Sequence, residues 1–85
     1  MKQKIRLHPH AEQRLSERGA TKDEVLATVQ SGEKFPAKFD RVGFRRNFAF
    51  GGPWRGRQYK TKQVEAYAVH ENEGWLVLTV MVKYF

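Results

Sequence analysis

The chain has 85 residues, of which 40% are hydrophobic and 29% are charged, and these proportions are typical of one folded domain over residues 1–85. No apolar run approaches the roughly 20 residues of a membrane span, and the segment MKQKIRLHPH lacks the apolar stretch of a secretory signal. We therefore expect a cytoplasmic protein with no membrane partner. Cysteine is absent, which excludes disulfides and thiolate chemistry.

The positive charge is concentrated in one segment of the chain. The formal net charge is +7, and residues 41–64 hold seven Lys or Arg residues and no Asp or Glu. Residues 1–40 carry +2 and residues 65–85 carry −2, so the central segment accounts for the whole excess. This segregation favours an acidic partner such as nucleic acid. A solvated basic surface that maintains solubility is the alternative.

The first predicted element is a helix from Pro9 to Arg18. Proline is favoured at the first helical position, where its missing N–H costs nothing, and Gly19 is expected to end the helix. Ala11 and Leu15 are four residues apart and form a narrow apolar stripe.

A second helix is expected to begin at Thr21 and to end at Gly32. Thr21 and Glu24 have the spacing of a capping box, in which each side chain satisfies a free backbone N–H. The apolar face of this helix consists of Val25, Leu26 and Val29.

After Gly32 the apolar period changes from helical to alternating, which is typical of strands. Four strands are expected, over Lys34–Phe39, Val42–Phe50, Lys62–His70 and Trp75–Phe85. The first contains Pro36 and is predicted to be an edge strand. Between the others, GGPWRGRQ (Gly51–Gln58) is predicted to be a loop, and Glu71–Gly74 a hairpin turn.

Strict alternation divides the last strand into two faces, both largely apolar, so we expect it to lie inside the sheet. One face would hold Leu76, Leu78, Val80, Val82 and Tyr84, and the other Trp75, Val77, Thr79, Met81 and Lys83. The predicted fold is α+β, with two N-terminal helices packed on one face of a four-stranded, mainly antiparallel sheet. The other sheet face would be open, basic and concave, which suits a nucleic-acid strand.

Three features of the sequence resemble those of a known family. The motif H-A-x-x-R-x-x-x-R-G spans His10–Gly19, a capped helix follows, and the last strand contains LVLTVMV at Leu76–Val82. In these features the chain resembles the domain of unknown function 4258 family, small prokaryotic domains grouped with RelE-type toxin ribonucleases. The resemblance implies a RelE/barnase-like fold, and either a metal-independent endoribonuclease or a degenerate relative of one. It also implies an acidic antitoxin protein as a partner.

The candidate catalytic residues are His10, Arg14, Arg45 and Thr79. A histidine titrates near neutral pH and can move the proton of a 2′-hydroxyl. Arginine holds a phosphate through two parallel donors and can stabilise the charge of a phosphorane. His10 and Arg14 are spaced i, i+4 and lie on one helix face at the border of the apolar stripe.

Each of these residues also has an ordinary structural explanation. His10 can cap or pack near the helix start, Arg14 can pair with a carboxylate, and Thr79 is a good strand residue. Arg18 continues the same helix face, but a cation before Gly19 is favoured by the helix dipole alone. His8 is expected to satisfy free N–H groups at the helix start.

The candidate nucleic-acid-binding residues are Arg46, Trp54, Arg55, Arg57, Tyr59, Lys60 and Lys62. The aromatic side chains can stack on unpaired bases, and the cations can hold phosphates. The alternative for Trp54 is that it folds back onto the small core. Arg45 and Arg46 are adjacent on a strand, so they point to opposite faces.

No metal or cofactor is expected, because the three histidines are scattered and no phosphate-binding glycine loop is present. The sequence therefore predicts an endoribonuclease that acts on RNA. The alternative is a non-catalytic adaptor that binds RNA, other single-stranded nucleic acid or an antitoxin.

Overall fold

The computed structural model describes residues 4–85; the first three residues of MKQKIRLHPH lie outside the described residues. The elements in chain order are β1 (Lys4–Leu7), α1 (Pro9–Gln13), α2 (Leu15–Arg18), α3 (Lys22–Ser31), β2 (Glu33–Pro36), β3 (Val42–Trp54), β4 (Arg57–Glu71) and β5 (Gly74–Tyr84). No helix in this part of the chain is long and apolar enough to cross a membrane.

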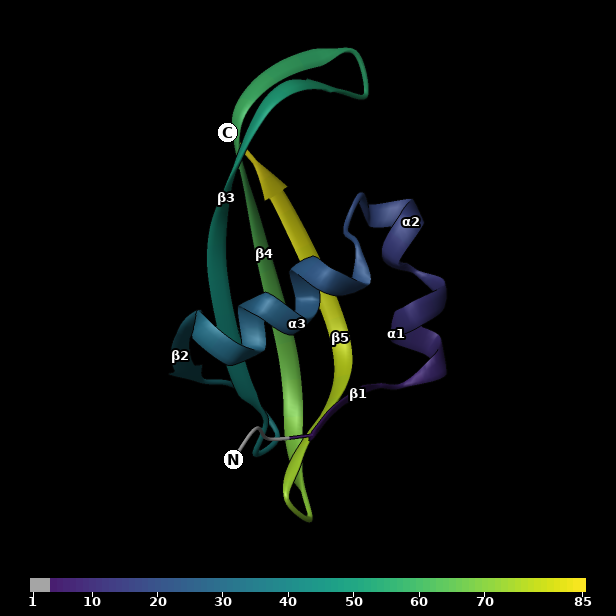
Figure 1. Ribbon diagram of the computed structural model, residues 1–85, viewed down its shortest axis with the longest axis vertical. Helices are drawn as coiled ribbons and strands as arrows, with labels where there is room; N and C mark the ends of the chain where they lie inside the picture. Colours follow the sequence, from purple (N-terminus) through teal and green to yellow (C-terminus); the bar gives the residue numbers. More distant parts are fainter. Residues whose placement is uncertain (1–3) are drawn as a thin grey trace.

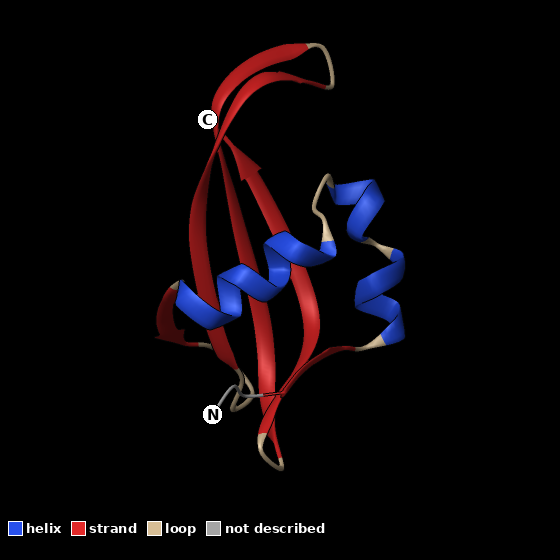
Figure 2. Ribbon diagram, in the orientation of Figure 1, coloured by secondary structure: helices blue, strands red, loops and turns tan. Residues whose placement is uncertain are grey.

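The strands form one mixed sheet in the order β1-β5-β4-β3-β2, in which β1 runs parallel to β5 and the other pairs are antiparallel. Helix α3 crosses the front of the sheet, and α1 and α2 lie beside the outer edge of β5 (Figure 1). The prediction of two helices on a four-stranded sheet is therefore wrong. Residues 4–85 form five strands and three short helices (Figure 2).

The strand that sequence analysis missed is β1. Its four residues are too few to show an alternating pattern, and its partner is residues 74–77 at the other end of the chain. Gly74 permits this pairing because a Cβ at that position would collide with the carbonyl group of Lys4. Ile5 and Leu7 then pack against the core.

The predicted helix Pro9–Arg18 is divided in two at Arg14. Arg14 has φ −91° and ψ −3°, so it ends α1 and begins α2 instead of continuing one helix. His8 caps α1, as predicted, because its Nδ1 accepts a hydrogen bond of 3.1 Å from the backbone N–H of His10. Gly19 ends α2 with φ +81°, a left-handed conformation that glycine adopts without steric cost.

Helix α3 confirms the predicted capping box. The hydroxyl of Thr21 accepts from the backbone N–H of Glu24 at 3.1 Å, and the carboxylate of Glu24 accepts from the N–H of Thr21 at 2.9 Å. Gly32 ends the helix, also as predicted.

The segment GGPWRGRQ, predicted as a loop, instead extends a β-hairpin beyond the body of the sheet (Figure 1). Strand β3 continues to Trp54, and β4 begins at Arg57 after a two-residue turn in which Arg55 and Gly56 both have positive φ. Gly51, with φ +58°, lies where the register between β3 and β4 shifts. The glycines therefore mark a bulge and a tight turn rather than a loop.

A second irregularity changes the faces of β5. Tyr67 pairs with Thr79 and Ala68 pairs with Val77, so Leu78 is an extra residue in β5. A bulge of this kind reverses the alternation beyond it. The predicted division of the strand is therefore wrong, and Trp75 and Val77 share the buried face with Val80.

The core lies between α3 and the front face of the sheet, which we call the helix face. Its central buried side chains are Val25, Phe44, Val64, Ala66, Trp75, Val77 and Val80. The rings of Phe44 and Trp75 meet edge to face with centroids 5.0 Å apart. The opposite face is not covered by any helix of residues 4–85 (Figure 1), and we call it the open face.

Candidate nucleic-acid interface

A small cleft lies between the α1–α2 segment and the outer edge of β5, with a volume of about 70 Å³. Its lining residues are His10, Ala11, Arg14, Arg18, Leu78, Thr79 and Val80. The bulge at Leu78 forms one wall of the cleft. The α1–α2 segment, which changes direction at Arg14, forms the other wall. The cleft therefore brings together three of the four predicted catalytic residues, His10, Arg14 and Thr79.

Positive charge in this cleft is not neutralised by neighbouring side chains. Within residues 4–85, the guanidinium of Arg14 makes no hydrogen bond or ion pair, and no carboxylate lines the cleft. Arg18 donates to the sulfur of Met81 at 2.9 Å. The predicted alternative of an Arg14–carboxylate pair is thus not found in this part of the chain, and the helix cap is supplied by His8 rather than His10.

A second recess, of about 290 Å³, continues the cleft toward the hairpin and shares Arg18 with it. It is lined by Glu17, Arg18, Trp54, Arg55, Val82 and Tyr84. Arg55 reaches across it and donates to the backbone carbonyl of Glu17 at 2.9 Å. His10, Arg14, Arg18 and Arg55 therefore follow the outer edge of β5, and we call these four residues the basic strip.

Trp54 is half-buried and packs within the hairpin. Its ring stacks on Tyr84 with centroids 4.9 Å apart and an interplanar angle of 18°, and the guanidinium of Arg55 lies 5.2 Å from its centroid. Phe50 and Tyr59 contact the same tyrosine. Trp54 thus folds back onto Tyr84 rather than onto the buried core, and it holds the hairpin beside α2.

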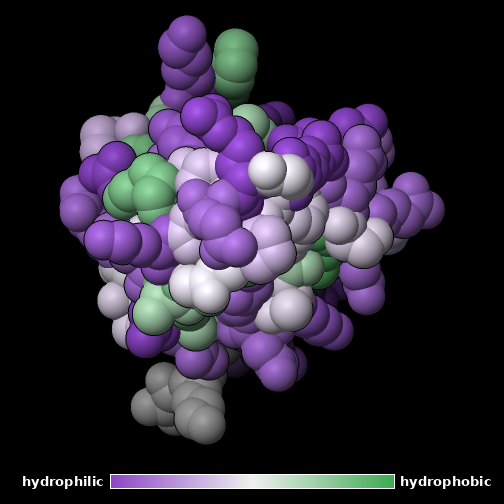
Figure 3. Space-filling view, turned by 90° about the horizontal axis from the view of Figure 1, so that it is seen from above, coloured by the Kyte–Doolittle hydropathy of each residue, from purple (hydrophilic) through white to green (hydrophobic). Residues whose placement is uncertain are grey.

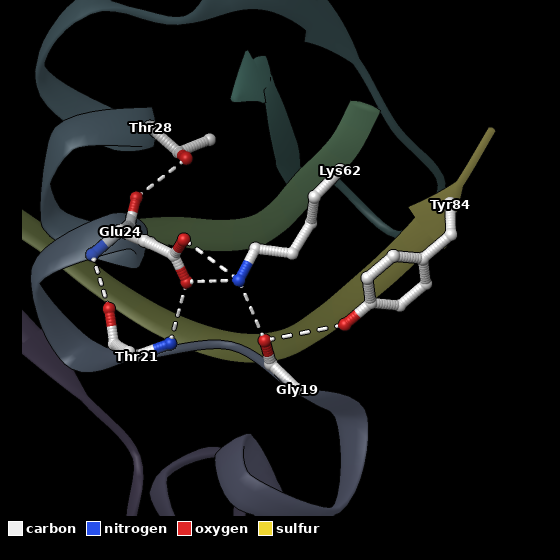
Figure 4. Close-up of polar contacts among 6 residues, drawn as sticks. All are labelled: Gly19, Thr21, Glu24, Thr28, Lys62 and Tyr84. Carbon is white, nitrogen blue, oxygen red and sulfur yellow. Dashed lines mark hydrogen bonds and ion pairs between the residues drawn. The ribbon is translucent and has the colours of Figure 1, made fainter. Parts of the chain in front are cut away.

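Lys62 has an internal role instead of the predicted contact with nucleic acid. It is 6% exposed, its ammonium lies 2.8 Å from the carboxylate of Glu24, and it donates to the carbonyl of Gly19 at 2.8 Å (Figure 4). The hydroxyl of Tyr84 points at the same carbonyl at 3.5 Å. Burial raises the pKa of Tyr84, Glu24 raises it further, and Arg55 partly offsets both effects.

Arg45 does not join the cleft. It lies on the open face and forms an ion pair of 2.6 Å with Glu33, which raises the pKa of the guanidinium. The nearby Glu65 is buried, accepts a hydrogen bond of 3.2 Å from Tyr67, and lies 3.6 Å from Lys83. Burial, and then Glu65, raise the pKa of Tyr67. These cations are paired, so the expected basic character is not found in this part of the open face.

The remaining predicted contacts lie elsewhere on the molecule. Arg46 donates to the hydroxyl of Ser31 at 2.9 Å and lies over the ring of Phe48. Arg57 and Lys60 are exposed on the hairpin. Seen along the long axis, this end of the molecule is mostly hydrophilic, with small and separate hydrophobic areas (Figure 3).

Neither the largest remaining recess nor any group of potential metal ligands in residues 4–85 provides a further candidate for a catalytic site. A recess of about 610 Å³ is lined by Lys4, Arg6, Glu71, Asn72 and Glu73, but Arg6 is paired with Glu71. Residues 4–85 contain no group of three His, Asp or Glu side chains that could hold a metal ion.

Comparisons with known proteins found no matching family model, no matching curated protein and no matching solved structure.

Proposed function

We propose that this protein is a metal-independent endoribonuclease that cleaves single-stranded RNA at the cleft beside β5, the activity that the family resemblance implies. One observation carries the proposal: His10, Arg14 and Arg18 meet Thr79 in one cleft without any carboxylate in its lining. Two guanidiniums that line one cleft repel each other, and a bound phosphate offsets that repulsion.

The chemistry requires a proton acceptor and stabilisation of the phosphorane. His10 accepts the proton of the 2′-hydroxyl as the 2′-oxygen attacks the phosphorus. The bond to the 5′-oxygen then breaks, and the same proton passes from His10 to the leaving oxygen. The products are a 2′,3′-cyclic phosphate and a 5′-hydroxyl. Arg14 and Arg18 stabilise the developing negative charge, and the hydroxyl of Thr79 positions the phosphate.

Residues outside the cleft would hold the rest of the strand. Arg55 continues the basic strip, and Arg57 and Lys60 extend positive charge along the hairpin. Contacts of this kind release counterions from the nucleic acid, so affinity would fall steeply as salt rises.

A second candidate function is a binding module without catalysis. Its support is the size of the cleft: about 70 Å³ is well below the roughly 300 Å³ of the smallest typical ligand pockets. A phosphate group fits such a cleft, whereas an enclosed nucleotide does not. The basic strip would then hold the backbone of RNA or the acidic tail of an antitoxin without using the proton chemistry of His10.

Cleavage of a labelled single-stranded RNA in excess chelator distinguishes these functions. We expect His10→Ala to lower the cleavage rate by about 100-fold or more. His70→Ala is the matched control, because His70 is an exposed histidine on β4 that packs against Trp75 rather than in the cleft. Cleavage that survives His10→Ala would contradict the catalytic role. Tight binding without cleavage by the unmodified protein would favour the binding module.

A further inference from the structure

A second candidate binding site lies at the opposite edge of the sheet, in the turn between β2 and β3. Phe39 is 84% exposed there and has φ +61°, and Asp40 follows with φ +58°. The turn is closed by two backbone hydrogen bonds, from the N–H of Ala37 to the carbonyl of Arg41 and from the N–H of Arg41 to the carbonyl of Lys38. It therefore holds an aromatic ring in solvent.

This conformation is unfavourable for a phenylalanine in two ways. Large side chains rarely adopt positive φ, since the Cβ then approaches the backbone too closely. The ring gains little from burial in return, because it is more exposed than Met81 and Phe85, and its neighbour in the turn is the guanidinium of Arg41, 6.0 Å from the ring centroid. Strained residues of this kind cluster at ligand-binding positions.

Phe39 borders a shallow groove of about 590 Å³. The groove is lined by Phe35, Pro36, Ala37, Lys38, Phe39, Arg41 and Tyr67. The rings of Phe35 and Tyr67 meet edge to face with centroids 6.0 Å apart. Gly43 lies beneath Phe35, where a Cβ would collide with the ring. Two fixed aromatic rings and one projecting ring thus surround an open apolar space.

The charges around the groove favour an anion beside its aromatic surface. Of the six charged residues in 33–45, Glu33 and Arg45 neutralise each other and Lys34 lies over the ring of Trp75, which leaves Lys38 and Arg41 against Asp40. Lys38 and Arg41 both line the groove. Aromatic faces next to cations are the combination that binds an unpaired base together with its phosphate.

The groove and the cleft lie at the two ends of one row of paired residues. Phe35 pairs with Gly43, Gly43 with Tyr67, and Tyr67 with Thr79, so one row of residues crosses the open face. Adjacent strands are about 4.8 Å apart, and the row spans about 15 Å. Its first member, Phe35, lines the groove, and its last, Thr79, lines the cleft.

We propose that the groove at Phe39 is a base-binding subsite for single-stranded RNA that crosses the open face from the cleft. An unpaired base would stack on Phe39, and Lys38 and Arg41 would hold the adjoining phosphate. The proposal rests on the proposed function only in assuming that RNA is the ligand; it does not require cleavage.

The test measures binding of a labelled oligouridine by fluorescence anisotropy, with every variant made in the non-cleaving His10→Ala protein. Phe39→Asn removes the ring but suits positive φ, so we expect about tenfold weaker binding and no loss of thermal stability. Phe39→Trp should retain binding. The matched control is Phe85→Asn, since Phe85 is 58% exposed outside the groove, and its affinity should be unchanged.

A second readout reports stacking directly. An RNA with a fluorescent purine analogue should lose emission on binding, and Phe39→Asn should restore that emission. If Phe39→Asn binds both RNAs like its parent, the subsite is wrong even where the unmodified protein cleaves RNA. If the protein cleaves nothing but binds RNA in a Phe39-dependent way, the subsite stands and the nuclease fails. Binding of a polyglutamate peptide but not of oligouridine would overturn the subsite in favour of an acidic protein partner.

Discussion

The cleft beside β5 adjoins the buried contacts of Lys62 with Glu24 and Gly19, because Arg18 lines the cleft and Gly19 follows it in the chain. The two regions use positive charge in opposite ways. Lys62 is buried, and its ammonium is held by a carboxylate and a carbonyl. Arg14 is exposed, and its guanidinium makes no ion pair or hydrogen bond within residues 4–85. The first arrangement stabilises the fold, and the second leaves donors free for a ligand. A cation with an internal partner therefore supports the fold, and a cation without one can bind a ligand. Its position in a basic segment of the sequence does not distinguish these two roles.

Lys62→Met gives the largest expected effect. It keeps about the same side-chain volume but removes the ammonium that contacts the Glu24 carboxylate and the Gly19 carbonyl. We expect the free energy of unfolding to fall by about 3 kcal/mol, the lower end for a broken buried pair because Glu24 is partly exposed. Urea unfolding measures this loss, and Lys60→Met on the exposed hairpin is the matched control. RNA binding at low temperature should be unchanged, and weaker binding would show that Lys62 also contacts RNA.

Arg14→Ala should lower activity and leave stability almost unchanged. The rate of RNA cleavage should fall by about 100-fold, as expected when one donor to a developing charge is removed, while unfolding should change by less than about 0.5 kcal/mol. Arg14→Lys should recover little of the rate, because an ammonium cannot form two parallel hydrogen bonds to a phosphate. A large loss of stability would instead show that Arg14 supports the break between α1 and α2.

The smallest expected effect concerns the hydroxyls of two half-buried tyrosines, Tyr67 and Tyr84. The pKa values of Tyr67 and Tyr84 are raised in the folded chain, whereas an unfolded tyrosine ionises near pH 10. The folded state thus keeps protons that the unfolded state releases, so this stability is present below about pH 10 and is lost as pH rises through the raised values. Urea midpoints measured across this range should fall less steeply for the Tyr67→Phe/Tyr84→Phe double variant. Equal slopes would contradict the prediction.

Local features of the fold could be predicted from the sequence, and long-range features could not. The capping box at Thr21 and the end of α2 at Gly19 each depend on a few neighbouring residues. Strand β1 depends on a partner 70 residues away. The bulge at Leu78 has no local signal, because the pattern of LVLTVMV is the same on both sides of Leu78. The bulge nevertheless reverses the strand faces that simple alternation assigns.

The candidate site divides in the same way. Spacing on one helix was enough to associate His10 with Arg14, and the structure adds Thr79 from the far end of the chain. The segregation of charge was visible in the sequence, but the partners that neutralise Arg45 and Lys62 were not, because those pairs depend on register and burial. Phe39 gave no signal, since its exposure and positive φ are properties of the folded turn.

The pairing of β1 with β5 has a consequence for synthesis. Residues 4–7 and the His10–Arg18 segment leave the ribosome well before their partners in residues 74–80 are made. Contacts so distant along the chain form late in folding. A growing chain therefore exposes its arginines before the opposite wall of the cleft exists, and any activity that needs both walls is withheld until residues 74–80 have emerged.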